Sequence, residues 1–145
     1  MACSYRLNLN NHCTSIREIT MKVIIAGGRD FTNATVMATV LNNLQDVDHA
    51  IEIEKLTLIC GMARGADITA YGLFKEAGLP IEEYPADWNQ YGKQAGFIRN
   101  TQMANVADMV IAFWDGKSRG TAHMIDTARK HNLNALVFNY EGNPI

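Results

Sequence analysis

The sequence predicts an α/β protein of the Rossmann-like, doubly wound class, with a mainly parallel five-stranded sheet and helices on both faces. Two observations lead to this prediction. Apolar runs typical of strands alternate along the chain with segments of helical periodicity. The runs are continuously apolar rather than alternating, which is typical of parallel strands buried on both faces.

The first predicted unit is strand, helix, strand. Residues 22–26 form a β-branched run that leads into Gly-Gly, as a buried strand would. Residues 32–46 carry apolar side chains at helical spacing, which predicts a helix. After a charged connection, the run LTLIC at residues 56–60 predicts the second strand.

The middle of the chain continues the alternation. Residues 66–77 place alanines and a leucine on one helical stripe, and Gly78 with Pro80 would end that helix. Residues 81–84 predict a third, weaker strand. The polar and aromatic segment at residues 85–94 is expected to be a loop.

The last part predicts two further helices and two further strands. The helices are expected at residues 95–106 and about 120–131, each beside an apolar run. The runs at residues 108–114 and 135–138 predict strands four and five.

The composition is that of one folded domain. The chain has 145 residues, 48% of them hydrophobic and 19% charged, so it can bury a core of its own. Its formal net charge is -2, and without a general positive field we do not expect nucleic acid to be a partner. No apolar run is long enough to span a membrane, so no membrane association is expected.

We expect a cytoplasmic protein with short extensions at both ends. The N-terminal residues lack a signal-peptide pattern, and three cysteines without a CxxC pair indicate a reducing compartment. Residues 1–20 are polar and aperiodic, which predicts an extension outside the core. The folded domain is expected at residues 21–139, followed by a loop-like tail at 140–145.

Three glycine-rich loops follow predicted strands. Their sequences are GGRD at residues 27–30, GMARGAD at residues 61–67 and DGKSRGT at residues 115–121. The carboxyl ends of parallel strands lie at one edge of a sheet, where such folds bind their ligands. Backbone amides and helix N-termini at that edge favour an anion. The sequence therefore predicts one nucleotide-like binding pocket built from three loops.

The third loop is the best phosphate cradle of the three. Ser118 and Thr121 supply hydroxyls, Arg119 supplies charge, and Gly120 lets the backbone approach a ligand at a helix start. It is not a Walker A motif, because no Gly-Lys-Ser/Thr closes it. The alternative interpretation is a plain capped helix start.

The first loop offers Gly27 and Gly28, whose amides could bind a phosphate, with Arg29 and Asp30 beside them. The same glycines could instead make a tight turn, and the loop lacks the GxGxxG pattern of dinucleotide sites.

The second loop offers a larger set of candidate ligand-binding residues, namely Gly61, Arg64, Gly65, Ala66 and Asp67. Asp67 could bind a ribose hydroxyl or could simply complement the N-terminus of the following helix.

Arg99 and Trp88 complete the residue-level candidates. Arg99 stands four residues before Met103, on the apolar stripe of its helix, where a charge is costly unless it is paired or binds an anion. It could pair with an aspartate of a neighbouring loop or contact a phosphate or ribose. Trp88 could stack on a base or anchor its loop. Histidines and cysteines show no metal-ligand spacing, so neither a metal nor a cofactor is expected.

Several of these motifs occur together and in order, and they resemble the YspA/YpsA-related branch of the SLOG superfamily. The motifs are GGRDF, GMARGAD, PADW, AGFIRN with Met103, and AFWDGKSRGT, within residues 21–138. The resemblance implies a Rossmann-like fold, nucleotides or ADP-ribose-like signalling molecules as ligands, homo-oligomers, and relatives in bacteria and phages. We include Asn100, the last residue of AGFIRN, among the expected ligand-binding residues.

The same superfamily contains the Lonely Guy phosphoribohydrolases, which use an arginine and the glutamate of GGxGTxxE. Arg99 resembles that arginine, and SRGT replaces GGxGT. Met124 stands where the glutamate would be, and it cannot act as acid, base or charge stabiliser. This departure from the pattern of the hydrolases therefore favours binding over cleavage.

Three functions follow as hypotheses. The first is a sensor or sequestering protein, such as a phage-encoded one, that binds a nucleotide-type ligand. The second is a nucleoside 5'-monophosphate N-glycosidase that would use Asp30 or Asp67 beside Arg99. The third, favoured least because of the net charge, is a DprA-like single-stranded DNA binder.

Overall fold

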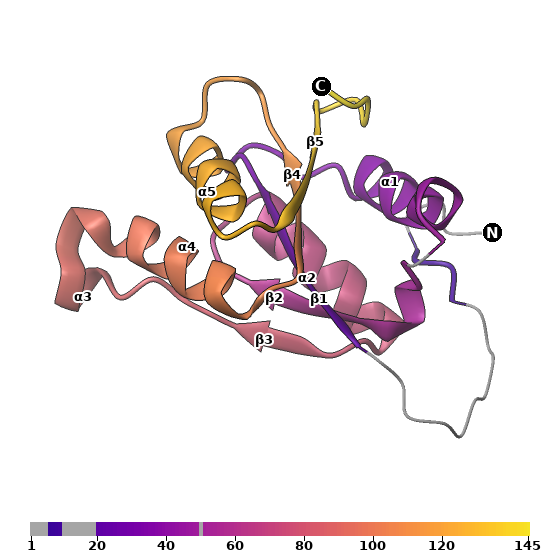
Figure 1. The fold of residues 1–145 in the computed structure, drawn as a ribbon, viewed down its shortest axis with the longest axis horizontal. Coiled ribbons are helices and arrows are strands. Elements are labelled where there is room, and N and C mark those ends of the chain that lie inside the picture. The colour runs from indigo at the N-terminus through magenta and orange to yellow at the C-terminus, as the bar shows by residue number, and fades with distance from the viewer. Residues whose placement is uncertain (1–5, 10–19, 50) are drawn as a thin grey trace.

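A parallel sheet forms the centre of the computed structural model, which describes residues 6–9, 20–49 and 51–145. The strands of this part of the chain are β1 (Met21–Gly27), β2 (Leu56–Cys60), β3 (Ile81–Glu83), β4 (Met109–Phe113) and β5 (Asn134–Phe138). Their order is β3-β2-β1-β4-β5, and every pairing is parallel (Figure 1). The predicted fold class is confirmed.

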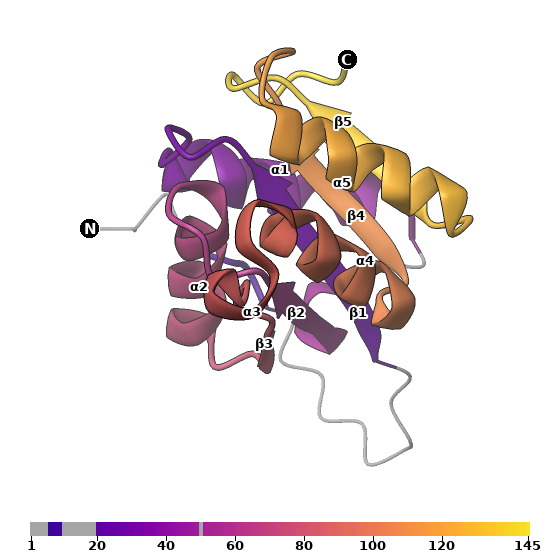
Figure 2. The same cartoon turned by 90° about the vertical axis from the view of Figure 1, so that its left-hand side faces the viewer.

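Helices cover both faces of the sheet. The four long helices are α1 (Ala34–Val47), α2 (Ala66–Ala77), α4 (Ala95–Val106) and α5 (Arg119–Lys130). Figures 1 and 2 show α1 and α2 on one side of the sheet and α4 and α5 on the other. Within the described residues, no helix combines the length and the apolar character that crossing a membrane requires.

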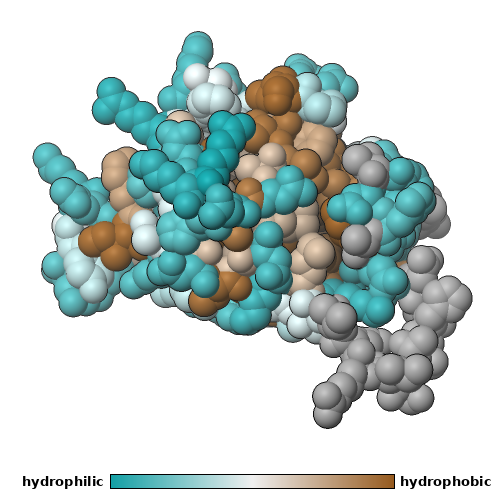
Figure 3. Space-filling model, in the orientation of Figure 1, coloured by the Kyte–Doolittle hydropathy of each residue, from teal (hydrophilic) through white to brown (hydrophobic). Residues whose placement is uncertain are grey.

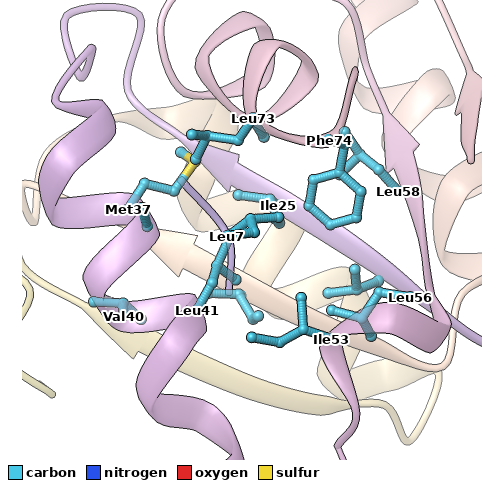
Figure 4. Close-up of a cluster of buried hydrophobic side chains, with 14 of the residues drawn as sticks. Leu7, Ile25, Met37, Val40, Leu41, Ile53, Leu56, Leu58, Leu73 and Phe74 are labelled. Atoms are coloured by element: carbon cyan, nitrogen blue, oxygen red, sulfur yellow. The ribbon is translucent and has the colours of Figure 1, made fainter. Parts of the chain in front are cut away.

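Two apolar clusters explain why the strands read as continuous apolar runs. Ile25 packs with the side of the sheet that α1 and α2 cover, whereas its neighbour Ile24 packs with Met103 of α4 and Met124 of α5. Consecutive strand residues are therefore buried on opposite faces. Figure 4 shows the larger cluster, in which Met37 and Leu41 of α1 approach the sheet.

The order of the strands places a crevice between β1 and β4. From β1 the chain builds outward through β2 to β3, and it then returns to the other side of β1 to build β4 and β5. The connections that leave the carboxyl ends of β1 and β4 diverge to opposite faces, and ligands of this fold class bind at such a point. The GGRD and DGKSRGT loops flank this crevice, and GMARGAD follows the adjacent β2.

The expected loop at residues 85–94 is wrong in part, because it contains the short helix α3 (Trp88–Tyr91) and the 3-10 turn Gly92–Gln94. The side chain of Asp87 caps α3 by accepting a hydrogen bond from the amide of Gln90 at 3.1 Å. A one-turn helix with no buried residue leaves no apolar periodicity in the sequence. A second 3-10 turn, Ile53–Lys55, lies within the predicted charged connection before β2.

Both chain ends contact the folded domain more than the sequence predicted. Most of residues 1–20 lie outside the described residues, so the predicted domain boundary stays a prediction. Leu7, however, is only 7% exposed and lies in the larger core cluster (Figure 4). In the C-terminal tail, Tyr140 packs at 4.9 Å between ring centroids on Phe31, and Pro144 bridges back to Phe138.

Candidate functional site

A cleft of about 680 Å³ lies at the carboxyl ends of β1 and β4, between the loops and the helices α3, α4 and α5. Most of the predicted ligand-binding residues line it. They are Gly27, Gly28, Arg29, Asp30, Arg64, Asp67, Trp88, Arg99, Asn100, Ser118, Gly120 and Thr121. The structure therefore brings residues from all three glycine-rich loops together with the α3–α4 segment.

Four predicted residues do not line the cleft, namely Gly61, Gly65, Ala66 and Arg119. Two of them fasten the second loop to the first. Gly65 has a φ of 87°, and a Cβ there would collide with the carbonyl oxygen of Gly28. The amide of Ala66 donates to that same carbonyl at 3.2 Å. The close loop–loop contact therefore accounts for both residues without a ligand.

The cleft also contains residues that the sequence reasoning did not select as ligand-binding. These are Ala26, Ala63, Lys93, Gly96, Phe97, Met103 and Met124. Gly96 and Met103 stand three before and four after Arg99, so helical spacing from Arg99 could have found them. Nothing comparable in the pattern singles out Lys93 or Phe97.

The start of α5 is held in shape by its own loop. Ser118 is the N-cap, and its hydroxyl lies 3.0 Å from that of Thr121. The carboxylate of Asp115 accepts hydrogen bonds from the amides of Lys117 and Ser118, both at 2.8 Å, which lower its pKa. Trp114 donates from its indole nitrogen to the carbonyl of Ser118 at 3.1 Å. The Thr121 amide donates to the Ser118 hydroxyl at 3.5 Å, so the first-turn amides that remain for a ligand are those of Arg119 and Gly120.

Arg99 lies on the cleft wall with hydrogen bonds to neutral groups. Its Nη1 donates to the carbonyl of Gly61, and its Nε donates to the side-chain oxygen of Asn100 at 3.3 Å. None of the ion pairs within the described residues includes Arg99. Burial lowers its pKa, and Asp67 partly opposes that shift. The guanidinium thus keeps a charge that no carboxylate contacts directly.

Asp67 and Arg99 both approach Gly61, and none of the ion pairs within the described residues joins them. A Cβ on Gly61 would lie 2.7 Å from a guanidinium nitrogen of Arg99 and 2.7 Å from a carboxylate oxygen of Asp67. The Asp67 carboxylate accepts from the amide of Ala63 at 3.2 Å, closing the turn before α2. Burial nevertheless raises the pKa of Asp67 to about 6. This carboxyl group can therefore change its charge near neutral pH.

Asn100 joins α4 to α5. It is 6% exposed, and its amide nitrogen lies 3.3 Å from the carbonyl of Gly120 and 3.2 Å from Nδ1 of His123. On its other side its oxygen accepts from Arg99. His123 in turn stacks on Phe97, with ring centroids 4.1 Å apart, and burial lowers its pKa. Asn100 therefore sets the position of the α5 N-terminus relative to Arg99.

Tyr140 holds the first loop from outside the cleft. Its hydroxyl donates to the carboxylate of Asp30 at 2.6 Å, and burial followed by this hydrogen bond raises the pKa of Tyr140. A Cβ on Gly28 would collide with the tyrosine hydroxyl and with the Asp30 carboxylate, so this contact requires a residue without a Cβ at position 28. The sequence pattern gave no signal for this contact, because it joins residues 110 positions apart.

The charge inside the cleft has the opposite sign to that of the whole chain. Four lining cations, Arg29, Arg64, Lys93 and Arg99, face two lining carboxylates, Asp30 and Asp67, which gives 4 − 2 = +2. The whole chain has a net charge of -2. None of the four cations takes part in an ion pair within the described residues. The described residues contain no group of His, Cys, Asp and Glu that could hold a metal ion.

Comparison with known proteins identifies the relatives of this chain. Residues 21–91 match the family model described as the YspA, cpYpsA-related SLOG family. The Gene 61 protein of Mycobacterium phage D29 is 35% identical over 123 residues, which cover 81% of this chain and 95% of that protein.

Two solved structures of DNA processing protein A (DprA) share the fold. The protein from Streptococcus pneumoniae superposes with a TM-score of 0.63 at 15% identity, over 82% of this chain and 50% of that one. The protein from Helicobacter pylori, solved to describe its single-stranded DNA binding mode, gives a TM-score of 0.54 at 20% identity. That match covers 81% of this chain and 65% of the other, so both DprA chains extend well beyond the shared region.

The expectation that nucleic acid is not a partner is wrong. It relied on the net charge of -2, yet the fold neighbours are DprA proteins and one of them is described by its binding of single-stranded DNA. Net charge is a poor criterion here because four of the 13 Lys and Arg residues line the cleft together with only two carboxylates.

The family match covers the first two glycine-rich loops, and the phage relative covers 81% of this chain. The chain belongs to the YspA/cpYpsA-related SLOG family.

Proposed function

We propose that the cleft binds a nucleotide or a nucleotide-derived signalling molecule through its phosphate, and that the protein senses or sequesters this ligand. One observation carries the proposal. Arg99 presents a guanidinium on the cleft wall whose hydrogen-bond partners are a carbonyl and an amide oxygen rather than a carboxylate. A partly buried charge of this kind is costly unless an anion completes its surroundings.

The α5 N-terminus supplies the rest of a phosphate site. The amides of Arg119 and Gly120 and the positive end of the helix dipole attract an anion, and the hydroxyls of Ser118 and Thr121 stand beside them. Asn100 fixes this helix end relative to Arg99, so the two anion-binding groups are arranged before a ligand arrives. Arg29 and Arg64 extend the positive lining along the cleft.

Binding without cleavage is the form of the proposal that the lining favours. Met124 is 1% exposed and lines the cleft at the position where the resemblance to the phosphoribohydrolases expects a glutamate. Its thioether cannot transfer a proton or stabilise an oxocarbenium-like transition state.

Calorimetry with adenosine 5'-monophosphate (AMP), ADP-ribose and a cyclic dinucleotide tests the proposal. We expect binding of at least one probe, weakened roughly 10- to 100-fold by Arg99→Gln, which removes a charged hydrogen-bond donor. Arg29→Gln repeats the test at an exposed lining residue, and Arg129→Gln, on the last turn of α5 and outside the cleft, serves as the control. Absence of binding to every probe, or equal loss in Arg129→Gln, would contradict the proposal.

Single-stranded DNA is the second candidate ligand, because both fold neighbours are DprA proteins. A fluorescently labelled oligothymidylate would compete with AMP if both occupy the cleft. Its affinity should then fall with salt with a logarithmic slope of about −0.7 for each phosphate contacted. A free mononucleotide that binds while the oligonucleotide does not would assign the cleft to small ligands.

Chromatography of the same incubations separates binding from hydrolysis. The release of free base from AMP, lost in Asp67→Asn, would make Asp67 a catalytic residue and would replace the binding proposal by the N-glycosidase alternative.

A further inference from the structure

The segment from α3 to the start of α4 carries exposed aromatic side chains, and α3 itself does not pack into the core. None of the α3 residues is buried. Trp88 is 52% exposed, Tyr91 39% and Phe97 44%. Figure 1 shows α3 projecting beyond the end of the sheet, and Figure 3 shows hydrophobic surface at that end of the molecule among hydrophilic residues. Trp88 therefore does not anchor its loop in a core.

Two of these aromatic residues, Trp88 and Phe97, line the cleft from different elements, whereas Tyr91 does not line it. Gly96 lies close to both Trp88 and Arg99, because a Cβ there would be in ordinary van der Waals contact, 3.6 Å from the indole and 3.9 Å from the guanidinium. Phe97 is supported from one side by the ring of His123, at 4.1 Å between centroids and an interplanar angle of 14°.

We infer that Trp88 and Phe97 form a nucleobase subsite at the α3–α4 end of the cleft. The inference rests on the proposed function, and it adds that the site selects nucleotides over sugar phosphates that lack a base. A base is flat and carries a π face, so it matches the exposed indole and the supported phenyl ring that line the same cleft.

The dimensions and charges of the cleft agree with a ligand whose phosphate and base bind at opposite ends. A volume of about 680 Å³ is typical of pockets that hold a whole small ligand and far exceeds a phosphate alone. Arg99 borders both ends, because one of its nitrogens lies near Gly96 while Asn100 links it to the α5 N-terminus. A nucleotide bound with its phosphate at α5 and its base at Trp88 would therefore place its sugar beside Arg99 and Asp67.

Calorimetry that compares AMP with ribose 5-phosphate measures the contribution of the base. We expect AMP to bind roughly 5- to 150-fold more tightly, the range for stacking of one base. Trp88→Ala should remove most of this ratio and leave the affinity for ribose 5-phosphate unchanged, and Trp88→Phe should retain part of it. Tyr91→Ala, an exposed aromatic residue of the same helix that does not line the cleft, is the matched control.

The outcomes separate this inference from the proposed function. Equal affinities for AMP and ribose 5-phosphate, with no effect of Trp88→Ala, would overturn the base subsite and leave the phosphate site intact. Loss of ribose 5-phosphate binding in Trp88→Ala would also overturn it, because the residue would then act on the phosphate end. If neither probe binds at millimolar concentration, both proposals fail. Quenching of tryptophan fluorescence by AMP that persists in Trp88→Phe would assign the signal to Trp114 and count against stacking on Trp88.

Discussion

Asp67 lies in the first turn of α2, where its burial makes ionisation of the carboxyl group costly. Its pKa in the folded protein is about 6, above the ordinary value of 3.8, and burial is the largest cause. The hydrogen bond from the Ala63 amide and the charge of Arg99 both favour the ionised form, but they do not offset the burial. A folded state that raises the pKa of a carboxyl group favours its protonated form. The ionised carboxylate therefore costs stability above about pH 6.

Asp67→Asn should be more stable than the wild type at pH 7, by about 1 to 2 kcal/mol, which is less than the full pKa shift because the residue is partly exposed. The wild type should lose stability relative to the variant as the pH rises from about 4 to about 6, while asparagine can still accept the Ala63 hydrogen bond. Urea unfolding at several pH values measures the difference, with the exposed Asp46→Asn as control. A difference that is constant over this pH range would contradict the assigned pKa.

Residues 6–9 pack against the folded domain, within the segment that the sequence predicts to be an extension. Leu7 lies in the core beside α1, and hydrogen bonds tie its neighbours to the same helix. The amide of Asn8 donates to the side chain of Asn42 at 2.8 Å, and Asn42 donates to the carbonyl of Arg6 at 2.9 Å. Arg6 also pairs with Glu76 of α2 at 2.8 Å.

Leu7→Ala should lower the free energy of unfolding by about 2 to 3 kcal/mol, because it removes buried methyl groups and leaves a cavity. Asn8→Ala, a change of an exposed side chain in the same segment, should have an effect below about 0.5 kcal/mol. Chemical unfolding of the two variants provides the measurement. Equal stabilities would mean that the segment does not contribute to the core in solution.

The elements with strong local patterns are those that the sequence predicted well. The strand LTLIC has the predicted bounds, and α4 begins and ends where its apolar stripe and flanking residues indicated. Elements that depend on distant contacts were not predictable. Leu7 looks isolated in a polar segment until α1 lies beside it, and Tyr140 reaches Asp30 only because β5 returns the chain to the first loop. The glycine-rich loops predicted the anion-binding end of the cleft because their motifs are local. Phe97 could not be predicted as a lining residue, because its position depends on the packing of α4 against α5.

The net charge of the chain and the charge of the cleft lining have opposite signs. The chain has 15 acidic and 13 basic residues, yet the cleft lining has an excess of two positive charges. Asp115 belongs to the third glycine-rich loop but does not line the cleft, because its carboxylate accepts hydrogen bonds from the amides of Lys117 and Ser118. The local field that an approaching anion meets is therefore positive, and it should decide affinity and its response to salt.

Arg64→Glu and Arg129→Glu change the net charge of the chain equally, from -2 to -4, but only the first changes the lining of the cleft. We expect Arg64→Glu to weaken AMP binding roughly tenfold at low salt, about 1.4 kcal/mol, because it replaces a positive by a negative charge in the lining of the cleft. Arg129→Glu should leave the affinity nearly unchanged, since it lies at the far end of α5. Calorimetry at low and physiological ionic strength measures both, and the effect of Arg64→Glu should shrink as salt screens exposed charges. Equal weakening by the two variants would show that the net charge, and not the cleft, governs the binding of anions.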